Sequence, residues 1–348
     1  MTSPQTTPAP LVSVVAVNYN CKKWLDRFFP SIQAQTIFDR IELVLVDNTS
    51  TDGSDKICQE KMAGWTNGVF VATGGNYGYG GGCNRGAAVA RGKYLFFINP
   101  DVWLEPNCLE EMLKYCERSG AGIASPRVLD YDSEALQGQG AAGFDIFGCM
   151  TSPREGELLA EPFAVAAFYF IAKELLLKAG GFDEEFFLFN EEMDLSWRVL
   201  IMGETIRQVP TAKIHHQGAS SGDRAVENRT SEQKRFFANR NQLLTLIKGG
   251  RFLLLGLVFT QLWLMAAEAI AGALMARRFS FVRWSLLKPI ADCWRLRKHL
   301  AAERQRIRGY RKHGDLWFLR HFFNFRFGRW NDVKRLLQAR GVKIDKAK

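Results

Sequence analysis

Four short apolar runs in the first part of the chain constrain its fold more than any other feature. They lie at residues 11–19, 41–47, 69–72 and 93–101, and the last one stops abruptly at Asn-Pro-Asp. Each run has the length of a strand buried on both faces, and the segments between the runs can hold helices. This alternation predicts an α/β fold with a Rossmann-like, mostly parallel sheet flanked by helices.

Helical spacing supports the first crossover, because Leu25, Phe28, Phe29 and Ile32 recur on one side of residues 21–35. Similar patterns predict the later elements: helices at 107–119, from Asn190 onward and at 231–248, a strand at 164–172, and a short strand pair at 205–210 and 212–222. We therefore expect the globular part of the chain to end near residue 250.

Charge separates that globular part from the rest of the chain. Residues 251–348 hold 22 Lys and Arg against 6 Asp and Glu, whereas residues 1–250 hold 24 against 30. We expect a disordered lead-in at 1–10 that lacks the features of a signal peptide, an α/β domain at 11–250 and a basic helical region at 251–348. Seven cysteines with no CxxC pair favour reduced thiols in a cytosolic domain and argue against a disulfide framework or a zinc site.

The basic region begins with an apolar stretch. Residues 252–276 contain one charged residue, Glu268, and are long enough to span a bilayer. A single span would place 21 basic and 5 acidic residues across the membrane from the front domain, against the positive-inside tendency. We favour a helix in the membrane interface, or a re-entrant pair with residues 281–300, and keep a single span as the alternative. Residues 316–330 interleave aromatics with Arg and His, which suits anionic lipid better than nucleic acid.

Asp101 follows a buried strand, so its carboxylate is expected at the sheet edge where ligands of α/β folds collect. A divalent cation on a diphosphate would suit it, because Mg²⁺ and Mn²⁺ take one or two carboxylates together with phosphate oxygens. A turn aspartate after proline is the alternative. His215 and His216 end a later strand and offer an imidazole as an extra metal ligand. Neighbours on a strand face opposite sides, so we expect one of them to face the site.

Asp47 ends the second run and is followed by the capping and turn residues NTSTDGS. It is placed to accept hydrogen bonds from a nucleotide, and an N-cap cluster is the structural alternative. Residues 74–86 contain seven glycines, which predict a loop whose backbone can approach a ligand, followed by a short helix to about Arg91. No GK[ST] follows, so the loop is not a P-loop, and a plain flexible turn stays open.

Glu191, Glu192 and Asp194 fall in the first turn of the helix that Asn190 is expected to cap. The helix dipole favours their ionised forms, whereas their mutual repulsion opposes ionising all three. One of them is a candidate general base, and a solvated acidic turn is the alternative. The apolar approach FFLF at 186–189 favours a buried helix start and therefore the functional interpretation.

In this order the segments resemble the family-2 inverting glycosyltransferases with the GT-A fold, especially the rhamnosyltransferase-like branch that builds bacterial surface polysaccharides. The resemblance covers roughly residues 11–248 and rests on five stretches: VSVVAVNYN, ELVLVDNTSTDGS, GGNYGYGGGCNRGAAVARGKYLFFINPDVWL, GGFDEEFFLFNEEMDLSWR and HHQGASSG. Five motifs in a fixed order make the resemblance specific.

The resemblance implies roles for particular residues. Glu192 would be the general base, with Glu191 as the alternative. His215 would join Asp101 in holding Mg²⁺ or Mn²⁺ on the donor diphosphate. The donor nucleotide would be bound by a larger set: Asn18, Asp47, Asn76, Gly78, Asn99 and Asp101.

The resemblance also implies a reaction and its setting. A sugar, most simply L-rhamnose from dTDP-L-rhamnose, would move to a polyprenyl-diphosphate-linked saccharide acceptor in O-antigen or other cell-surface polysaccharide synthesis. The enzyme would lie at the cytoplasmic face of the bacterial inner membrane, peripheral or monotopic, against an anionic lipid surface. The alternatives are a glycosyltransferase with another nucleotide sugar, a sugar nucleotidyltransferase, and a non-catalytic adaptor for membrane or nucleic acid.

Three departures from the family pattern stand out. Asn99 occupies a place where the metal motif often has a second acidic residue, so Asp101 is the one carboxylate of the motif and a lower metal affinity is expected. Glu192 stands where Asp is usual, which bears on the choice of base. Phe168 and Tyr169 replace small residues before the GGFDEEFF stretch, which bears on the acceptor pocket.

Overall fold

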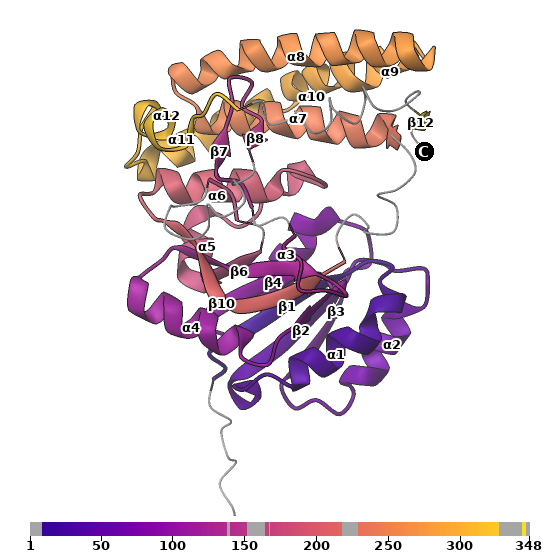
Figure 1. The fold of residues 1–348 in the computed structure, drawn as a ribbon, viewed down its shortest axis with the longest axis vertical. Helices are drawn as coiled ribbons and strands as arrows, with labels where there is room; N and C mark the ends of the chain where they lie inside the picture. The colour runs from indigo at the N-terminus through magenta and orange to yellow at the C-terminus, as the bar shows by residue number, and fades with distance from the viewer. Residues whose placement is uncertain are drawn as a thin grey trace, which may run out of the picture. The chain divides into compact units, whose positions relative to one another are not determined.

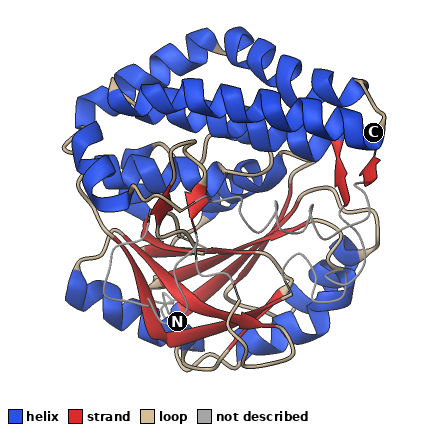
Figure 2. Ribbon diagram, turned by 45° about the horizontal axis from the view of Figure 1, so that its top comes forward, coloured by secondary structure: helices blue, strands red, loops and turns tan. Residues whose placement is uncertain are grey.

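The computed structural model describes residues 9–137, 140–151, 164–166, 168–217, 229–326 and 343–345. It contains two compact units (Figures 1 and 2). The sheet unit comprises Met1–Gly138, Ala167–Glu184 and Arg207–Gly218, and the helical unit comprises Gln139–Ala166, Glu185–Ile206 and Ala219–Lys348. Residues 1–8 of the expected lead-in, 218–222 of the second strand of the expected pair and 327–330 of the aromatic basic stretch lie outside the described residues.

The sheet unit is built on one eight-stranded sheet with the order β3-β2-β1-β4-β9-β6-β10-β5. Its strands are β1 Val12–Asn18, β2 Ile41–Asp47, β3 Gly68–Ala72, β4 Tyr94–Ile98, β5 Val102–Leu104, β6 Ile123–Asp130, β9 Tyr169–Ala172 and β10 Ile206–His216. The four strands β3, β2, β1 and β4 are parallel, as the alternating runs predicted.

The remainder of the sheet is mixed. Strand β9 is antiparallel to both β4 and β6, and β5 is antiparallel to β10. The expectation of a mostly parallel sheet therefore holds for only one half. Parallel pairing needs a crossover of about a dozen residues or more, usually a helix. The described residues between β6 and β9 include no helix.

Helices flank the sheet. They are η1 Lys22–Trp24, α1 Leu25–Gln33, η2 Phe38–Arg40, α2 Ser54–Met62, α3 Gly78–Val89, α4 Cys108–Ser119 and α5 Lys173–Ala179. Alternate residues of β1 divide between the two faces: Val14 and Ala16 join a core with α1, α2 and α4, whereas Val15 and Val17 lie under α3. Burial on both faces explains why these strands read as continuous apolar runs.

The glycine-rich segment is mainly helical, which corrects the predicted loop. Helix α3 begins at Gly78 and contains five of the seven glycines. A Cβ added at Gly82 would lie 2.7 Å from Val17 Cγ1, and one added at Gly86 would lie 2.3 Å from Val15 Cγ1. Because these glycines are four residues apart, they let one side of α3 lie directly on β1, and this contact outweighs the low helix propensity of glycine.

Two later elements also differ from expectation. The predicted strand pair at 205–210 and 212–222 is one continuous strand, β10. Pro210 is tolerated because β5 pairs only with Ile214–His216, which leaves one side of β10 open at the proline. The strand predicted at 164–172 is shorter: β9 covers its last four residues, and Val165 forms an isolated bridge with Ala141.

The helical unit holds η3 Glu184–Phe186 in part, α6 Glu191–Ile201, α7 Glu232–Gly249, α8 Leu253–Ala276, α9 Ser280–Val282, the π-helix η5 Arg283–Leu287, α10 Lys288–Arg295, α11 Arg297–Tyr310 and α12 Asp315–Phe322. It also has two small strand pairs, β7 Gly143–Phe144 with β8 Met150–Thr151, and β11 Arg229–Ser231 with β12 Lys343–Asp345. Helix α7 was expected to close the α/β domain. It packs with α8, α10 and α11. The two compact units therefore do not divide at residue 250, where the domain boundary was predicted.

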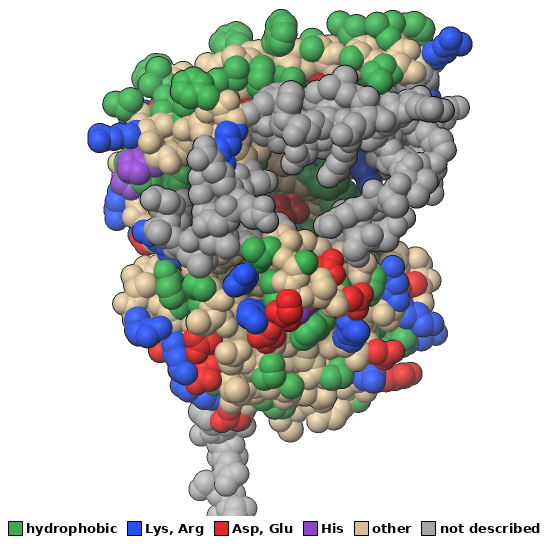
Figure 3. All heavy atoms as spheres, in the orientation of Figure 1, with side chains coloured by type: hydrophobic (Ala, Val, Ile, Leu, Met, Phe, Trp, Pro, Cys, Tyr) green, Lys and Arg blue, Asp and Glu red, His purple; other side chains and the backbone are tan. Residues whose placement is uncertain are grey.

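Helix α8 carries the apolar stretch as one unbroken helix. Its residues Leu253–Met275 have a mean hydropathy of 1.8, and by length and composition they could cross a membrane. One side packs inside the helical unit through residues such as Leu264 and Met265, and another side leaves Phe259 and Trp263 exposed. Apolar side chains gather along α8 on the face shown in Figure 3. The helix is therefore two-sided, as a membrane-associating element requires.

Candidate active site

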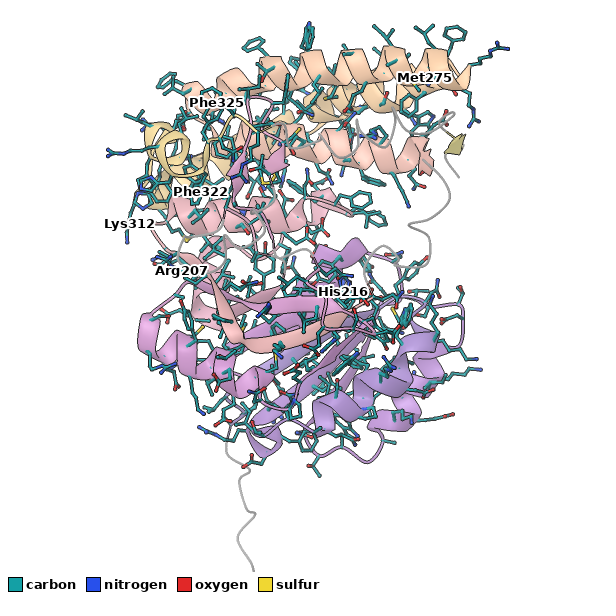
Figure 4. The ribbon with its side chains drawn as sticks, viewed as in Figure 1. Arg207, His216, Met275, Lys312, Phe322 and Phe325 are labelled. Atoms are coloured by element: carbon teal, nitrogen blue, oxygen red, sulfur yellow. The ribbon has the colours of Figure 1, made fainter. Side chains whose placement is uncertain are left out.

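Asp101 and His216 lie together where β4 and β10 end in the sheet unit, and Figure 4 labels His216. Asp101 Oδ2 is 3.5 Å from His216 Nε2. The other ring nitrogen, Nδ1, is 2.8 Å from Gln137 Oε1, while Gln137 Nε2 donates to the His216 carbonyl at 3.0 Å. Gln137 therefore fixes the proton on Nδ1 and leaves a lone pair on Nε2, the nitrogen that faces Asp101.

These two residues fit a divalent cation. Asp101 Oδ1 is buried and has no hydrogen-bond partner among the described residues. A carboxylate oxygen without a donor is costly unless a cation or solvent satisfies it, and the unprotonated Nε2 beside it is the form of histidine that ligates metals. Asn99, between β4 and Asp101, is half-buried. The donor set of one carboxylate and one imidazole leaves most positions of a hexacoordinate ion to phosphate oxygens and water.

His215, the histidine that the family resemblance assigned to the metal, faces the other side of β10. Its ring stacks on Trp103 at 3.7 Å, and its Nδ1 lies 2.9 Å from the Asp130 carbonyl. The reason is the strand periodicity that predicted only one inward histidine: His215 pairs across the sheet with Trp103, and His216 pairs with Val102. The structure brings Asp101 to His216 and not to His215.

A second group of possible ligands surrounds His215. Ligand atoms of Glu105, Glu134 and His215 lie within 4.8 Å of one another, beside a cavity of about 670 Å³. However, Lys213 Nζ lies 3.3 Å from Glu105 and 3.5 Å from Glu134. The ammonium group already supplies a positive charge there, so this group is a weaker candidate for a metal than Asp101 with His216.

Asn18 and Asp47 end the adjacent parallel strands β1 and β2 and are paired in register. Asn18 Nδ2 donates to Asp47 Oδ1 at 2.7 Å, and Asp47 also accepts the Ser50 hydroxyl at 2.6 Å and the Thr49 and Ser50 amides at 3.1 Å. Four donors occupy the usual acceptor capacity of a carboxylate. Both the nucleotide and the capping interpretations predicted polar contacts here. The contacts present are those of a turn, in which Asp47 accepts the amides two and three residues further on, whereas the N-cap residue of α2 is Gly53.

Asn48, which the sequence did not single out, organises the loop before α3. Its Nδ2 donates to the Gly78 carbonyl at 2.8 Å and its Oδ1 accepts the Tyr77 amide at 3.3 Å. Asn76 Oδ1 accepts the Gly78 amide at 2.9 Å, and the Asn76 residue is exposed. The predicted donor residues Asn76 and Gly78 therefore belong to a pinned turn. The only sequence signal for Asn48 was its position next to Asp47 at a strand end.

The acidic turn lies in the helical unit, at the start of α6. Glu191 is buried and its Oε2 has no hydrogen-bond partner among the described residues, while Glu192 is half-buried. Burial raises the pKa of both carboxyls, and the charge of Glu192 raises the pKa of Glu191 further. Asp194 differs, because it pairs with Arg198 Nη2 at 2.8 Å and with Lys248 Nζ at 2.9 Å. Asp194 is thus part of an ion-pair network. Glu191 and Glu192 therefore remain the candidates for the general base.

The chain reaches that turn through an unusual backbone. Phe187, Phe189 and Asn190 all have φ between 57° and 68°, the left-handed region that is rare for residues other than glycine. Asn190 is the N-cap residue as predicted, but its side chain makes no cap hydrogen bond. Such strain persists only where neighbouring structure enforces it, and it gathers at functional sites.

Helix α7 supplies the enforcement. The Asn241 side-chain amide lies 2.7 Å from the carbonyl oxygens of Leu188 and Phe189 and 2.8 Å from that of Phe186. Asn241 is fully buried, and Arg240 beside it donates to the Phe186 carbonyl at 3.1 Å. No local pattern marked these α7 side chains, because their partners lie about fifty residues away in the sequence.

With this geometry established, comparison with known proteins defines the class. Residues 13–171 match the family described as Glycosyl transferase family 2. These residues carry a domain of this family, as the sequence motifs predicted.

Curated relatives cover different shares of the chain. The N-acetylglucosaminyl-diphospho-decaprenol L-rhamnosyltransferase of Mycobacterium tuberculosis (strain ATCC 25618 / H37Rv) is 28% identical over 246 residues, which is 61% of this chain and 78% of that protein. The minor teichoic acid biosynthesis protein GgaB of Bacillus subtilis (strain 168) is 26% identical over 64% of this chain and 25% of its own length. The glycosyltransferase EpsH of the same Bacillus strain is 35% identical, but the match spans only 30% of each protein.

Solved structures agree on the fold. A crystal structure of GalNAc-T7 with UDP, GalNAc and Mn²⁺ superposes with a TM-score of 0.60 at 16% identity, over 79% of this chain and 54% of that one. A crystal structure of S. aureus TarS 1–349 with UDP has a TM-score of 0.53 at 14% identity, over 86% and 90%. At these identities the likeness shows the GT-A type of fold.

Proposed function

We propose that this chain is an inverting glycosyltransferase that transfers L-rhamnose from dTDP-L-rhamnose to a saccharide carried on a polyprenyl diphosphate. The observation that carries the transfer chemistry is the Asp101–His216–Gln137 arrangement at the sheet edge. The rhamnosyl donor and the lipid-linked acceptor rest on the named Mycobacterium relative, which aligns over most of its own length.

Asp101 and His216 would hold Mg²⁺ or Mn²⁺, which when bound supplies positive charge against the donor diphosphate. His216 replaces His215 in this assignment because its Nε2, and not that of His215, faces Asp101. Asn18, Asp47 and Asn48 would shape the nucleotide pocket, since their hydrogen bonds fix the ends of β1 and β2. We also propose that the donor nucleotide contacts three further residues, Asn76, Gly78 and Asn99.

Glu192 is proposed as the general base, with Glu191 kept as the alternative. The carboxylate takes the proton of the acceptor hydroxyl as that oxygen forms its bond to the anomeric carbon. The bond from the anomeric carbon to the diphosphate oxygen breaks with the electron pair leaving on the diphosphate. A single displacement of this kind inverts the anomeric configuration.

A donor panel tests the proposal. Thermal unfolding of the full chain is measured with dTDP-L-rhamnose, UDP-glucose, UDP-N-acetylglucosamine and GDP-mannose, each with and without Mn²⁺. A ligand that binds only the folded state raises its stability, so we expect the largest shift with dTDP-L-rhamnose and Mn²⁺. Transfer to an N-acetylglucosaminyl-diphospho-lipid is then followed by mass spectrometry. A selective response to another nucleotide sugar would reject the rhamnosyl assignment and leave the transferase class intact.

A further inference from the structure

A cavity of about 570 Å³ in the helical unit is lined mainly by cationic residues. Its lining residues are Arg251, Arg304, Arg308, Arg311 and Lys312, with Phe252, Leu255 and Gly314. They come from the start of α8, from the second half of α11 and from the turn that joins α11 to α12. Among the described residues, no acidic side chain lines the cavity.

The positive charges that line the cavity are not offset by salt bridges within the part of the chain that the structure describes. Among the described residues, none of the five forms an ion pair, whereas Arg240 pairs with Asp292 at 2.9 Å and Arg306 with Glu303 at 2.5 Å. Placing like charges together without a counter-ion costs free energy. The cavity is therefore electrostatically suited to an anion that carries more than one negative charge.

Hydrogen bonds hold the cavity walls in place. Arg304 donates to the carbonyl oxygens of Ile247 and Gly250, and Arg311 donates to that of Gly249 at 2.5 Å. Asp315 accepts the backbone amides of Arg251 at 3.0 Å and Phe252 at 2.8 Å, which ties the α11–α12 turn to the start of α8. The site is thus built from fixed backbone and two anchored guanidinium groups.

The remaining three cations are available to a ligand. Among the described residues, the side chains of Arg251, Arg308 and Lys312 make no hydrogen bond, and all three are exposed. Figure 4 labels Lys312 at the outside of the helical unit. The Nε of Arg311 is buried without a hydrogen-bond partner among these residues, so the wall itself has an unsatisfied donor. Burial lowers the pKa of Arg311, and the neighbouring Arg251 and Arg304 lower it further, although the charge of Asp315 partly opposes this shift.

An apolar surface begins at the same place. Phe252 lines the cavity and is 83% exposed, and Phe259, Trp263, Ile270 and Leu274 continue an exposed row along α8. These positions are separated by seven and four residues, the spacing of a single helical face. Helix α8 spans 24 residues, about 36 Å, so a hydrocarbon chain could follow it for its whole length.

We propose that this cavity binds the phosphate or diphosphate headgroup of a lipid whose hydrocarbon chain lies along the exposed face of α8. A lipid joins the two chemistries that meet here, a multivalent anion and an apolar chain. Nucleic acid fits less well, because stacking platforms need several aromatic rings around the cations, and Phe252 is the only ring among the described residues that line the cavity. The inference refines the lipid-linked acceptor of the proposed function, and an anionic phospholipid would use the same groups.

Binding of farnesyl diphosphate to the full chain tests the inference by calorimetry. The measurement is made with EDTA and without nucleotide sugar, so that a metal-dependent donor site does not contribute. We expect saturable binding near one to one, weakened about tenfold or more in Arg308→Gln/Lys312→Gln because two charged contacts are lost. Arg251→Gln gives an independent check from a different element.

The matched control is Arg297→Gln/Lys298→Gln, which removes the same charge from the exposed first turn of the same helix, α11. It should bind farnesyl diphosphate like the native chain. An equal loss of affinity in both double variants would mean that farnesyl diphosphate is attracted by the overall positive charge, and it would overturn the site. Absence of binding would also overturn it. So would displacement of farnesyl diphosphate by single-stranded RNA at equal charge. Farnesol should bind poorly.

Vesicle sedimentation then identifies the source of the headgroup. Phosphatidylcholine vesicles containing a polyprenyl diphosphate are compared with vesicles containing phosphatidylglycerol. A preference for either supports the site and names its ligand. Because neither assay requires sugar transfer, a chain that binds the lipid but transfers no sugar would overturn the proposed function alone.

Discussion

His216 Nε2 lies 3.5 Å from Asp101 Oδ2, while its Nδ1 is held by Gln137. The geometry resembles that of a metal-ligating histidine, in which one ring nitrogen is free for the metal because a hydrogen bond from the other nitrogen orients the ring. His215, one residue earlier, is stacked on Trp103. We therefore expect substitution of His216 to affect metal binding and substitution of His215 to affect stability alone.

We expect His216→Ala and Asp101→Ala each to abolish the stabilisation that Mn²⁺ gives to donor binding, with transfer lost as well. Gln137→Ala should weaken Mn²⁺ affinity by about 10- to 100-fold, because the imidazole loses its orientation. His215→Ala is the matched control. It should keep the Mn²⁺ effect while lowering stability through loss of the Trp103 contact, and the reverse pattern would place the metal at His215.

Glu192→Gln should remove transfer while leaving donor binding intact. Since burial raises the Glu192 pKa above its ordinary value of 4.5, and only the ionised form accepts a proton, kcat should rise with pH through that higher pKa. The measurement is a pH–rate profile at saturating donor. If Glu191→Gln is the inactive variant and Glu192→Gln is active, the base has been assigned to the wrong glutamate.

Glu191→Gln should increase stability at neutral pH. The folded-state pKa of Glu191 is raised, so the stability linked to its protonation is present at low pH and is lost as the pH rises through that pKa. A glutamine removes the buried charge and its repulsion with Glu192. Urea unfolding at several pH values should show a gain that fades toward acidic pH, and a gain that grows on acidification would contradict the account.

Asn241→Ala should lower kcat by about 10- to 100-fold with little change in donor binding, because small displacements of a catalytic group are costly. The amide nitrogen lies within hydrogen-bond distance of three carbonyl oxygens of the strained approach to α6, and its two N–H groups hold that segment, which would relax without them. Asn239→Ala is the control: it removes a comparable buried bond, to the Ser285 carbonyl at 2.7 Å, from the same helix. Similar kcat losses in both variants would reduce Asn241 to a purely structural role.

Gly82→Ala and Gly86→Ala should each lower the free energy of unfolding by about 1–3 kcal/mol, because overpacking forces α3 away from β1. The added Cβ would meet Val17 or Val15 at 2.7 or 2.3 Å. Gly64→Ala, where no atom lies within 4 Å, should cost little. Chemical denaturation of the three variants distinguishes this packing role from a loop role, for which all three would behave alike.

The chain's sequence by itself determined the parallel half of the sheet, helices α1, α4 and α7, and the family. These features depend on local periodicity and on short motifs such as the run that ends at Asp101, and local patterns survive whatever packs around them. The sequence also limited the metal-facing histidine to one of two neighbours, since the period of a strand is two.

Only the tertiary structure decided which histidine faces Asp101, because that choice depends on the register of β10 with β5. The same is true of Gln137 at the imidazole, of Asn241 at the approach to α6, and of the glycines that form a helix against β1. Each depends on contacts between residues far apart in the sequence, with no local period to reveal them. The basic cavity is the clearest case: its five cations are spread over 62 positions among many other charges, and only folding brings them to one cavity.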